Sequence, residues 1–128
     1  MPGKLVDVIT SSDPALRNTP LEAICQSAGL GELLSECELL ESFRKTSRNL
    51  YERVRALFFL YAIHRFHLPP KPGLNSRGFV PFEGYEHLLK RRFEEALAVF
   101  LETQRASGPN DAISSALAAT LWAVERSI

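Results

Sequence analysis

The sequence predicts an all-α protein built from about five helices. Apolar residues recur every three or four positions over most of the chain, and no segment alternates apolar and polar residues as a strand does. Of the 128 residues, 45% are hydrophobic and 23% are charged, which is typical of a globular domain. We therefore expect one helical domain over residues 1–128, a compact bundle or a short helical-hairpin array, either alone or as a module of a larger protein.

The first two predicted helices occupy the acidic N-terminal third of the chain. Thr19 and Pro20 are typical of a helix start, because the threonine hydroxyl caps free amides and proline suits the first turn. Gly29 ends this helix. The second helix, over residues 31–45, has an apolar stripe and an acidic outer surface.

The third predicted helix begins at Asn49, a favourable N-cap, and continues to about residue 68. Its middle is an uninterrupted run of eight apolar residues, 56–63. Because apolar side chains cover every side, we expect this helix to be central, with Leu57, Phe58 and Tyr61 buried. Truncation of Phe58 to alanine is expected to cost about 3–5 kcal/mol.

Residues 69–82 contain four prolines and two glycines, which predicts one long loop. A loop of this length is a candidate binding element. The fourth helix is predicted from Glu83 to Ala106, with Leu89 among its inward-facing residues, and Gly108 ends it. Asp111 is expected to cap the fifth helix, which has an apolar stripe flanked by alanines.

Charge is unevenly distributed although the net charge is zero. Residues 44–92 hold eleven basic and three acidic residues, whereas the flanking segments are acidic. Such a block could bind the phosphates of RNA, DNA or a nucleotide. Ion pairing with the acidic helices is the favoured alternative. The candidate anion-binding residues are Arg44, Arg48, Arg55, Lys71, Arg77, Lys90, Arg91 and Arg92.

The C-terminal helix is the predicted interface. Leu121, Trp122 and Val124 lie close to the end of the sequence and Ile128 is its last residue, while the neighbouring alanines permit close approach of another helix. We expect a contact outside the chain, with a second copy or with another polypeptide; burial within the domain is the alternative. The candidate interface residues are Leu121, Trp122, Val124 and Ile128.

Cysteine and histidine usage predicts neither a metal site nor a catalytic site. Cys25 and Cys37 fit no disulfide or zinc pattern and are expected to be buried, reduced thiols. His64 and His67 share a helix face but lack the glutamates of a helical di-metal site. No nucleophile, base and acid converge, so we expect no cofactor and no catalysis by this chain alone.

No apolar run approaches the roughly eighteen residues that a membrane-spanning helix needs, and no apolar segment of secretory length develops near the start. We therefore expect a cytoplasmic protein with no membrane contact.

One segment resembles a known repeat. Phe93-Glu94-Glu95-Ala96 with Phe100, followed by Pro109-Asn110-Asp111-Ala112, resembles the second helix and exit turn of a tetratricopeptide repeat. The likeness covers about twenty residues and departs in the longer stretch before the proline and in the long loop. It implies stacked helical hairpins with a partner-binding surface and no catalytic residues.

Together these features predict a non-catalytic helical protein-interaction or accessory module. A protein partner or a homodimer is favoured over nucleic acid. Two alternatives remain: a phosphate or nucleic-acid binding module that uses residues 44–92, and a helical accessory domain of a multidomain enzyme.

Overall fold

Helices form every regular element in residues 3–74, 78 and 80–128, the part of the chain that the computed structural model describes. The all-α class is confirmed for these residues. The expectation of about five helices is wrong, because eight α-helices and one π-helical turn are present in the described part. In chain order they are α1 (Lys4–Thr10), α2 (Pro14–Arg17), α3 (Leu21–Ser27), α4 (Leu30–Thr46), α5 (Leu50–Ala62), η1 (Ile63–His67), α6 (Phe82–Leu89), α7 (Phe93–Ser107) and α8 (Asp111–Arg126).

The short helix α1 is stabilised by a residue distant in sequence, which is why local patterns did not predict it. Its N-cap, Gly3, has no side chain to cap the free amides. The buried carboxylate of Glu36, on α4, accepts a hydrogen bond of 2.9 Å from the N–H of Leu5. A carboxylate at a helix N-terminus satisfies an orphan donor and interacts favourably with the helix dipole.

Helix α3 replaces the first predicted helix, with a different start. Pro20 occupies the N-cap position and no side chain caps the helix, so the expected role of Thr19 as the cap is wrong. The end before Gly29 is confirmed, since the last helical residue is Ser27.

The central position of the third predicted helix is confirmed. Helix α5 contacts α1, α4 and α8, and the side chain of Asn49 caps it by accepting from the N–H of Glu52 at 3.1 Å. Leu57 is buried, but Phe58 is 52% exposed and Tyr61 is half-buried. The prediction for Phe58 is wrong because no helix of the described residues covers that side of α5.

The fourth predicted helix is two helices, because the chain turns between α6 and α7. The N–H groups of Arg91 and Arg92 donate to the carbonyls of Leu88 and His87, at 3.0 and 2.9 Å, in the pattern that ends a helix with a left-handed residue. That residue is Arg91, with φ of 60°. The predicted inward position of Leu89 is wrong, since its side chain is 82% exposed.

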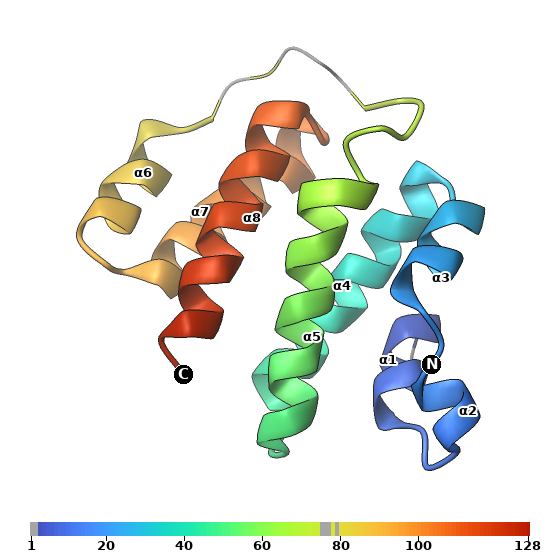
Figure 1. Ribbon diagram of the computed structural model, residues 1–128. Coiled ribbons are helices and arrows are strands. Elements are labelled where there is room, and N and C mark those ends of the chain that lie inside the picture. Colours follow the sequence, from blue (N-terminus) through green and yellow to red (C-terminus); the bar gives the residue numbers. More distant parts are fainter. Residues whose placement is uncertain (1–2, 75–77, 79) are drawn as a thin grey trace.

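The break between the last two helices lies where it was predicted. Helix α7 ends at Gly108, whose φ of 85° favours glycine. The cap of α8 is Asn110 and not Asp111, because the Asn110 carboxamide accepts from the N–H of Ile113 at 2.8 Å. α7 and α8 form an antiparallel pair (Figure 1).

The predicted loop 69–82 is only partly described. Residues 75–77 and 79 lie outside the described residues, and α6 already begins at Phe82. At the start of the segment, the Nζ of Lys71 donates to the carbonyl of Cys25 at 2.6 Å and so ties the chain to the last turn of α3.

Five helices supply most of the core, and one side of the α5 and α8 pair remains exposed. Buried apolar residues come mainly from α1, α4, α5, α7 and α8. Helices α5 and α8 run side by side at the front of Figure 1, with α4 and α7 behind them and α6 at the outer edge. Among the described helices, none is both long enough and apolar enough to cross a membrane.

Candidate functional site

The exposed side of α8 is unusual for a surface helix. Its exposed positions after the first residue are Ala112, Ser115, Ala119, Trp122 and Arg126. None of residues 112–124 is charged. A solvated helix face normally carries charged side chains, whereas depletion of charge around an exposed aromatic residue is typical of a protein interface.

Aromatic side chains of α5 and η1 lie next to this face of α8 and extend it across the contact between α5 and α8. The ring of Tyr61 lies 5.6 Å from that of Trp122 and 6.2 Å from that of Phe66, centroid to centroid. Phe58 precedes Tyr61 by three residues and is exposed, as are Phe66 at 61% and Trp122 at 47%. We call the set Phe58, Tyr61, Arg65, Phe66, Ser115, Ala119, Trp122 and Arg126 the α5–α8 surface.

A groove of about 360 Å³ lies within the α5–α8 surface. Tyr61 and Arg65 line it from the α5 side, and Ser115, Ala119 and Trp122, with the buried Ala118, line it from α8. Short side chains along the groove allow a second helix axis to approach closely, while the aromatic rings offer apolar contact area.

The arginines of this surface form no ion pair with any described residue. Among the described residues, no carboxylate oxygen lies within 4 Å of the guanidinium nitrogens of Arg65 or Arg126. The Cζ of Arg126 instead lies 5.1 Å from the ring centre of Trp122. An arginine stacked on a tryptophan is held in position with donors free to bind a carboxylate.

A second hollow, of about 520 Å³, adjoins Phe58 on its other side, between α5 and the connection from α2 to α3. Arg55 lies in it and donates from Nη2 to the carbonyl of Arg17 at 2.6 Å. Its Cζ lies 5.1 Å from the ring centre of Phe59. Its Nη1 is buried without a hydrogen-bond partner in the described part of the chain.

The predicted interface residues separate into two pairs. Leu121 and Val124 are buried against the protein's own core, whereas Trp122 and Ile128 are exposed. Leu121 and Val124 belong to the apolar stripe of α8 that faces the core, whereas Trp122 lies on the other side of the helix.

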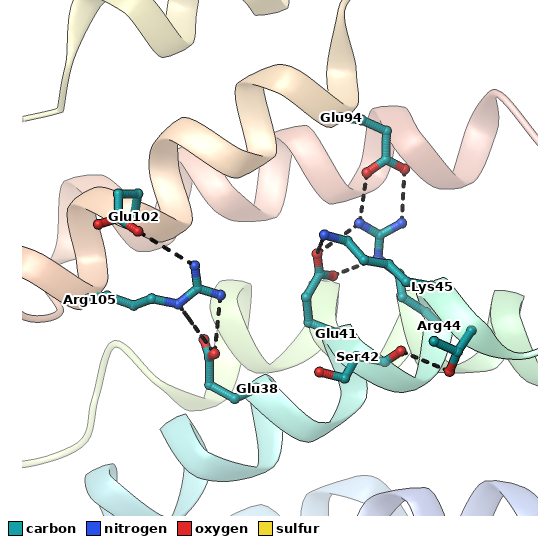
Figure 2. Close-up of polar contacts among 9 residues, drawn as sticks. Glu38, Glu41, Ser42, Arg44, Lys45, Glu94, Glu102 and Arg105 are labelled. Atoms are coloured by element: carbon teal, nitrogen blue, oxygen red, sulfur yellow. Dashed lines mark hydrogen bonds and ion pairs between the residues drawn. The ribbon is translucent and has the colours of Figure 1, made fainter.

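Arg44 is engaged inside the domain. Its guanidinium is 4% exposed and donates to Glu41 on α4, with contacts of 2.6 and 2.9 Å, and to both oxygens of Glu94 on α7 at 2.9 Å (Figure 2). Hydrogen bonds from Arg44 lower the pKa of the Glu94 carboxyl. The arrangement ties α4 to α7, and Arg105 of α7 pairs similarly with Glu38 of α4 at 3.1 Å.

The other predicted anion-binding residues do not gather at one place. Lys71 caps α3 and Arg55 holds Arg17, as described above. Arg48 is exposed at the start of α5, while Lys90, Arg91 and Arg92 are exposed in the turn between α6 and α7. Arg77 lies outside the described residues.

Arg91 belongs beside the α5–α8 surface. With Trp122 and Arg126 it lines a further hollow of about 310 Å³, and its Cζ lies 5.4 Å from the ring centre of Phe93. Its left-handed backbone is strained for a residue with a side chain, and such strain is concentrated at functional sites.

Both thiols and the imidazole of His64 are buried. Cys25 and Cys37 are free and buried, as expected, and burial raises the pKa of the Cys25 thiol to about 11. Burial lowers the pKa of His64 to about 4. No three His, Cys, Asp or Glu residues of the described ranges are placed to hold a metal ion.

Sequence reasoning missed Phe58, Arg65, Phe66 and Arg126 as surface residues. Phe58 lies in the apolar run 56–63, which predicts burial, and Phe66 lies in the same predicted helix, so only their exposure in the structure identifies them as surface residues. The sequence does contain one sign of this surface. Residues at helical spacing from Ser115, namely Ala119 and Trp122, form an outer face of α8 without charge.

Comparisons with protein-family models, with curated proteins and with solved structures found no match to this chain.

Proposed function

We propose that this protein is a non-catalytic interaction module that binds another polypeptide through the α5–α8 surface. The observation that carries the proposal is the combination of half-exposed aromatic rings and unpaired arginines on a helix face without charge from residue 112 to 124. Tryptophan, tyrosine and arginine are the residues that contribute most often to binding hot spots.

The composition of the surface supports a polypeptide as the partner. Its groove is lined by apolar and short side chains and one arginine of α5, η1 and α8. Buried reduced thiols fit the cytoplasmic location that we include in the proposal. If the protein is an accessory domain of an enzyme, the polypeptide that the α5–α8 surface binds is part of that enzyme.

Co-purification from the cells in which the protein occurs tests the proposal. The test variant combines Phe58→Ser with Trp122→Ser, which removes one exposed ring from α5 and one from α8. The matched control combines Phe82→Ser with Leu89→Ser, two exposed apolar residues of α6, at 72% and 82% exposure. We expect the test variant to lose associated proteins that the control retains.

Both variants must unfold at similar denaturant concentrations, so that loss of binding reflects the surface and not the fold. An association that survives in the test variant as fully as in the control would contradict the proposed function.

A further inference from the structure

We infer that the partner of the α5–α8 surface is an acidic amphipathic helix that lies along the groove beside α8. This inference rests on the proposed function and goes further by giving the partner's secondary structure and charge. Three observations carry it: the shape of the groove, its charge, and the unfavourable charge that a second copy of this chain would bring.

The shape suits a helix. Ser115, Ala118 and Ala119 form the floor of a shallow groove beside the contacting rings of Tyr61 and Trp122. From Ser115 to Arg126 the exposed face of α8, which contains the groove, is about 16 Å long, because a helix rises about 1.5 Å per residue. Three turns of a partner helix fit this length, with apolar residues three and four positions apart facing the groove.

The charge suits carboxylates. Arg65 lines the groove and Arg126 stacks on its tryptophan, and neither has a carboxylate partner in the described part of the chain. Arg91 adds a third positive charge beside Trp122. Glu125 lines the hollow at Phe58, and two glutamates of α7, Glu94 and Glu95, line a further hollow with Arg91.

The same charges disfavour a homodimer through this surface. A two-fold axis places the same patch on both sides of the interface, so the positive charges of Arg65, Arg91 and Arg126 would be present on both sides. Like charges brought together without partners oppose association. An acidic partner turns each of these contacts into an attraction.

Fluorescence of Trp122, the chain's single tryptophan, provides the readout. The probes are two synthetic helical peptides of about three turns. Both carry leucines three and four positions apart on one face; one carries glutamates on the flanking positions and the other lysines. At low salt we expect the glutamate peptide to shift the Trp122 emission and to bind at least about tenfold more tightly than the lysine peptide.

Charge reversal sharpens the test. The variant Arg65→Glu with Arg126→Glu is expected to prefer the lysine peptide. The control, Lys4→Glu with Arg48→Glu, changes the net charge equally at exposed basic residues outside the surface and is expected to keep the preference for glutamate.

The outcomes separate this inference from the proposed function. Equal binding of both peptides, with emission changes at Trp122, would overturn the acidic partner and leave the interaction surface intact. Binding of neither peptide, together with unchanged co-purification of the Phe58→Ser and Trp122→Ser variant, would overturn both. Sedimentation showing a dimer that Trp122→Ser dissociates would replace the acidic helix with a second copy.

Discussion

Individual residues in this fold take roles that their type alone does not suggest. Arg44, a candidate for external phosphate, is buried between Glu41 and Glu94 and joins α4 to α7. Phe58, from the most apolar segment of the chain, is half exposed. Arg91 occupies a helix end where glycine is usual. In each case the surroundings, and not the residue type, decide the role.

Replacement of Arg91 by glycine is expected to stabilise the protein. A left-handed backbone costs a residue with a side chain about 1–2 kcal/mol, part of which the greater freedom of unfolded glycine offsets. We expect Arg91→Gly to raise the free energy of unfolding by about 0.5–1 kcal/mol in urea denaturation. Arg91→Ala keeps the strain and serves as the control. Equal effects of the two substitutions would show that the backbone of Arg91 is not strained.

Burial of His64 predicts a loss of stability in mild acid. Its pKa is about 4 in the folded protein, against an ordinary value of 6.5. Below pH 6.5 the unfolded chain therefore takes up a proton that the folded protein refuses, and stability falls until about pH 4. Between pH 7 and pH 5 we expect a loss of about 2 kcal/mol in the free energy of unfolding.

The variant His64→Gln cannot titrate and isolates this effect, whatever its own stability. Its free energy of unfolding, measured by urea denaturation at the same two pH values, is expected to fall by about 2 kcal/mol less than that of the unaltered protein. Parallel pH profiles would contradict a neutral, buried His64.

At the level of elements, the position of each helix depends on contacts between helices. Helix α1 is capped by Glu36 of α4, and α3 is capped at its end by Lys71, which follows η1. The π-helical turn η1 ends at His67, and the N–H of the next residue, Leu68, donates to the carbonyl of Ile63 at 2.8 Å. Glu36 and Lys71 are distant in sequence from the helices that they cap, whereas the hydrogen bond at the end of η1 is local.

Close packing of α6 on α7 depends on Gly84. A Cβ at this position would lie 2.6 Å from Cζ of Phe100 and even closer to Cε1. We expect Gly84→Ala to lower the free energy of unfolding by about 1–3 kcal/mol, because the buried Phe100 ring cannot move away without disturbing the core.

Gly31 provides the matched control for this substitution. It also lies in a helix, α4, but a Cβ there would meet no atom within 4 Å. Gly31→Ala is expected to leave the protein unchanged or to stabilise it by up to about 1 kcal/mol. Chemical denaturation of both variants gives the comparison, and a similar change in the two would rule out close packing at Gly84.

For the whole molecule, the fold distributes the basic central segment over several local roles. Arg44, Arg55 and Lys71 bind groups of the protein itself, while Arg48 and Lys90–Arg92 belong to separate connections. Tight binding of a polyanion requires many basic side chains along one surface.

We therefore expect only weak binding to nucleic acid. In titrations of labelled single-stranded and double-stranded oligonucleotides, we expect a Kd of about 100 µM or weaker at physiological salt, the weak end of non-specific binding. A Kd below about 1 µM that weakens steeply as salt rises would instead assign an external phosphate-binding role to the basic segment.

The sequence by itself determined the all-α class, the extents of α4 and of α5 with η1, and the ends at Gly29 and Gly108, because helical periodicity and capping are local. It also placed the central helix and the buried thiols. Tertiary structure decided the rest. The cap of α1 and the internal use of Arg44 depend on contacts between distant segments. The candidate site also depends on tertiary structure. Phe58 and Phe66 are surface residues because the described helices leave that side of α5 and η1 exposed. Hydrophobicity alone does not show which side of a helix the other helices cover.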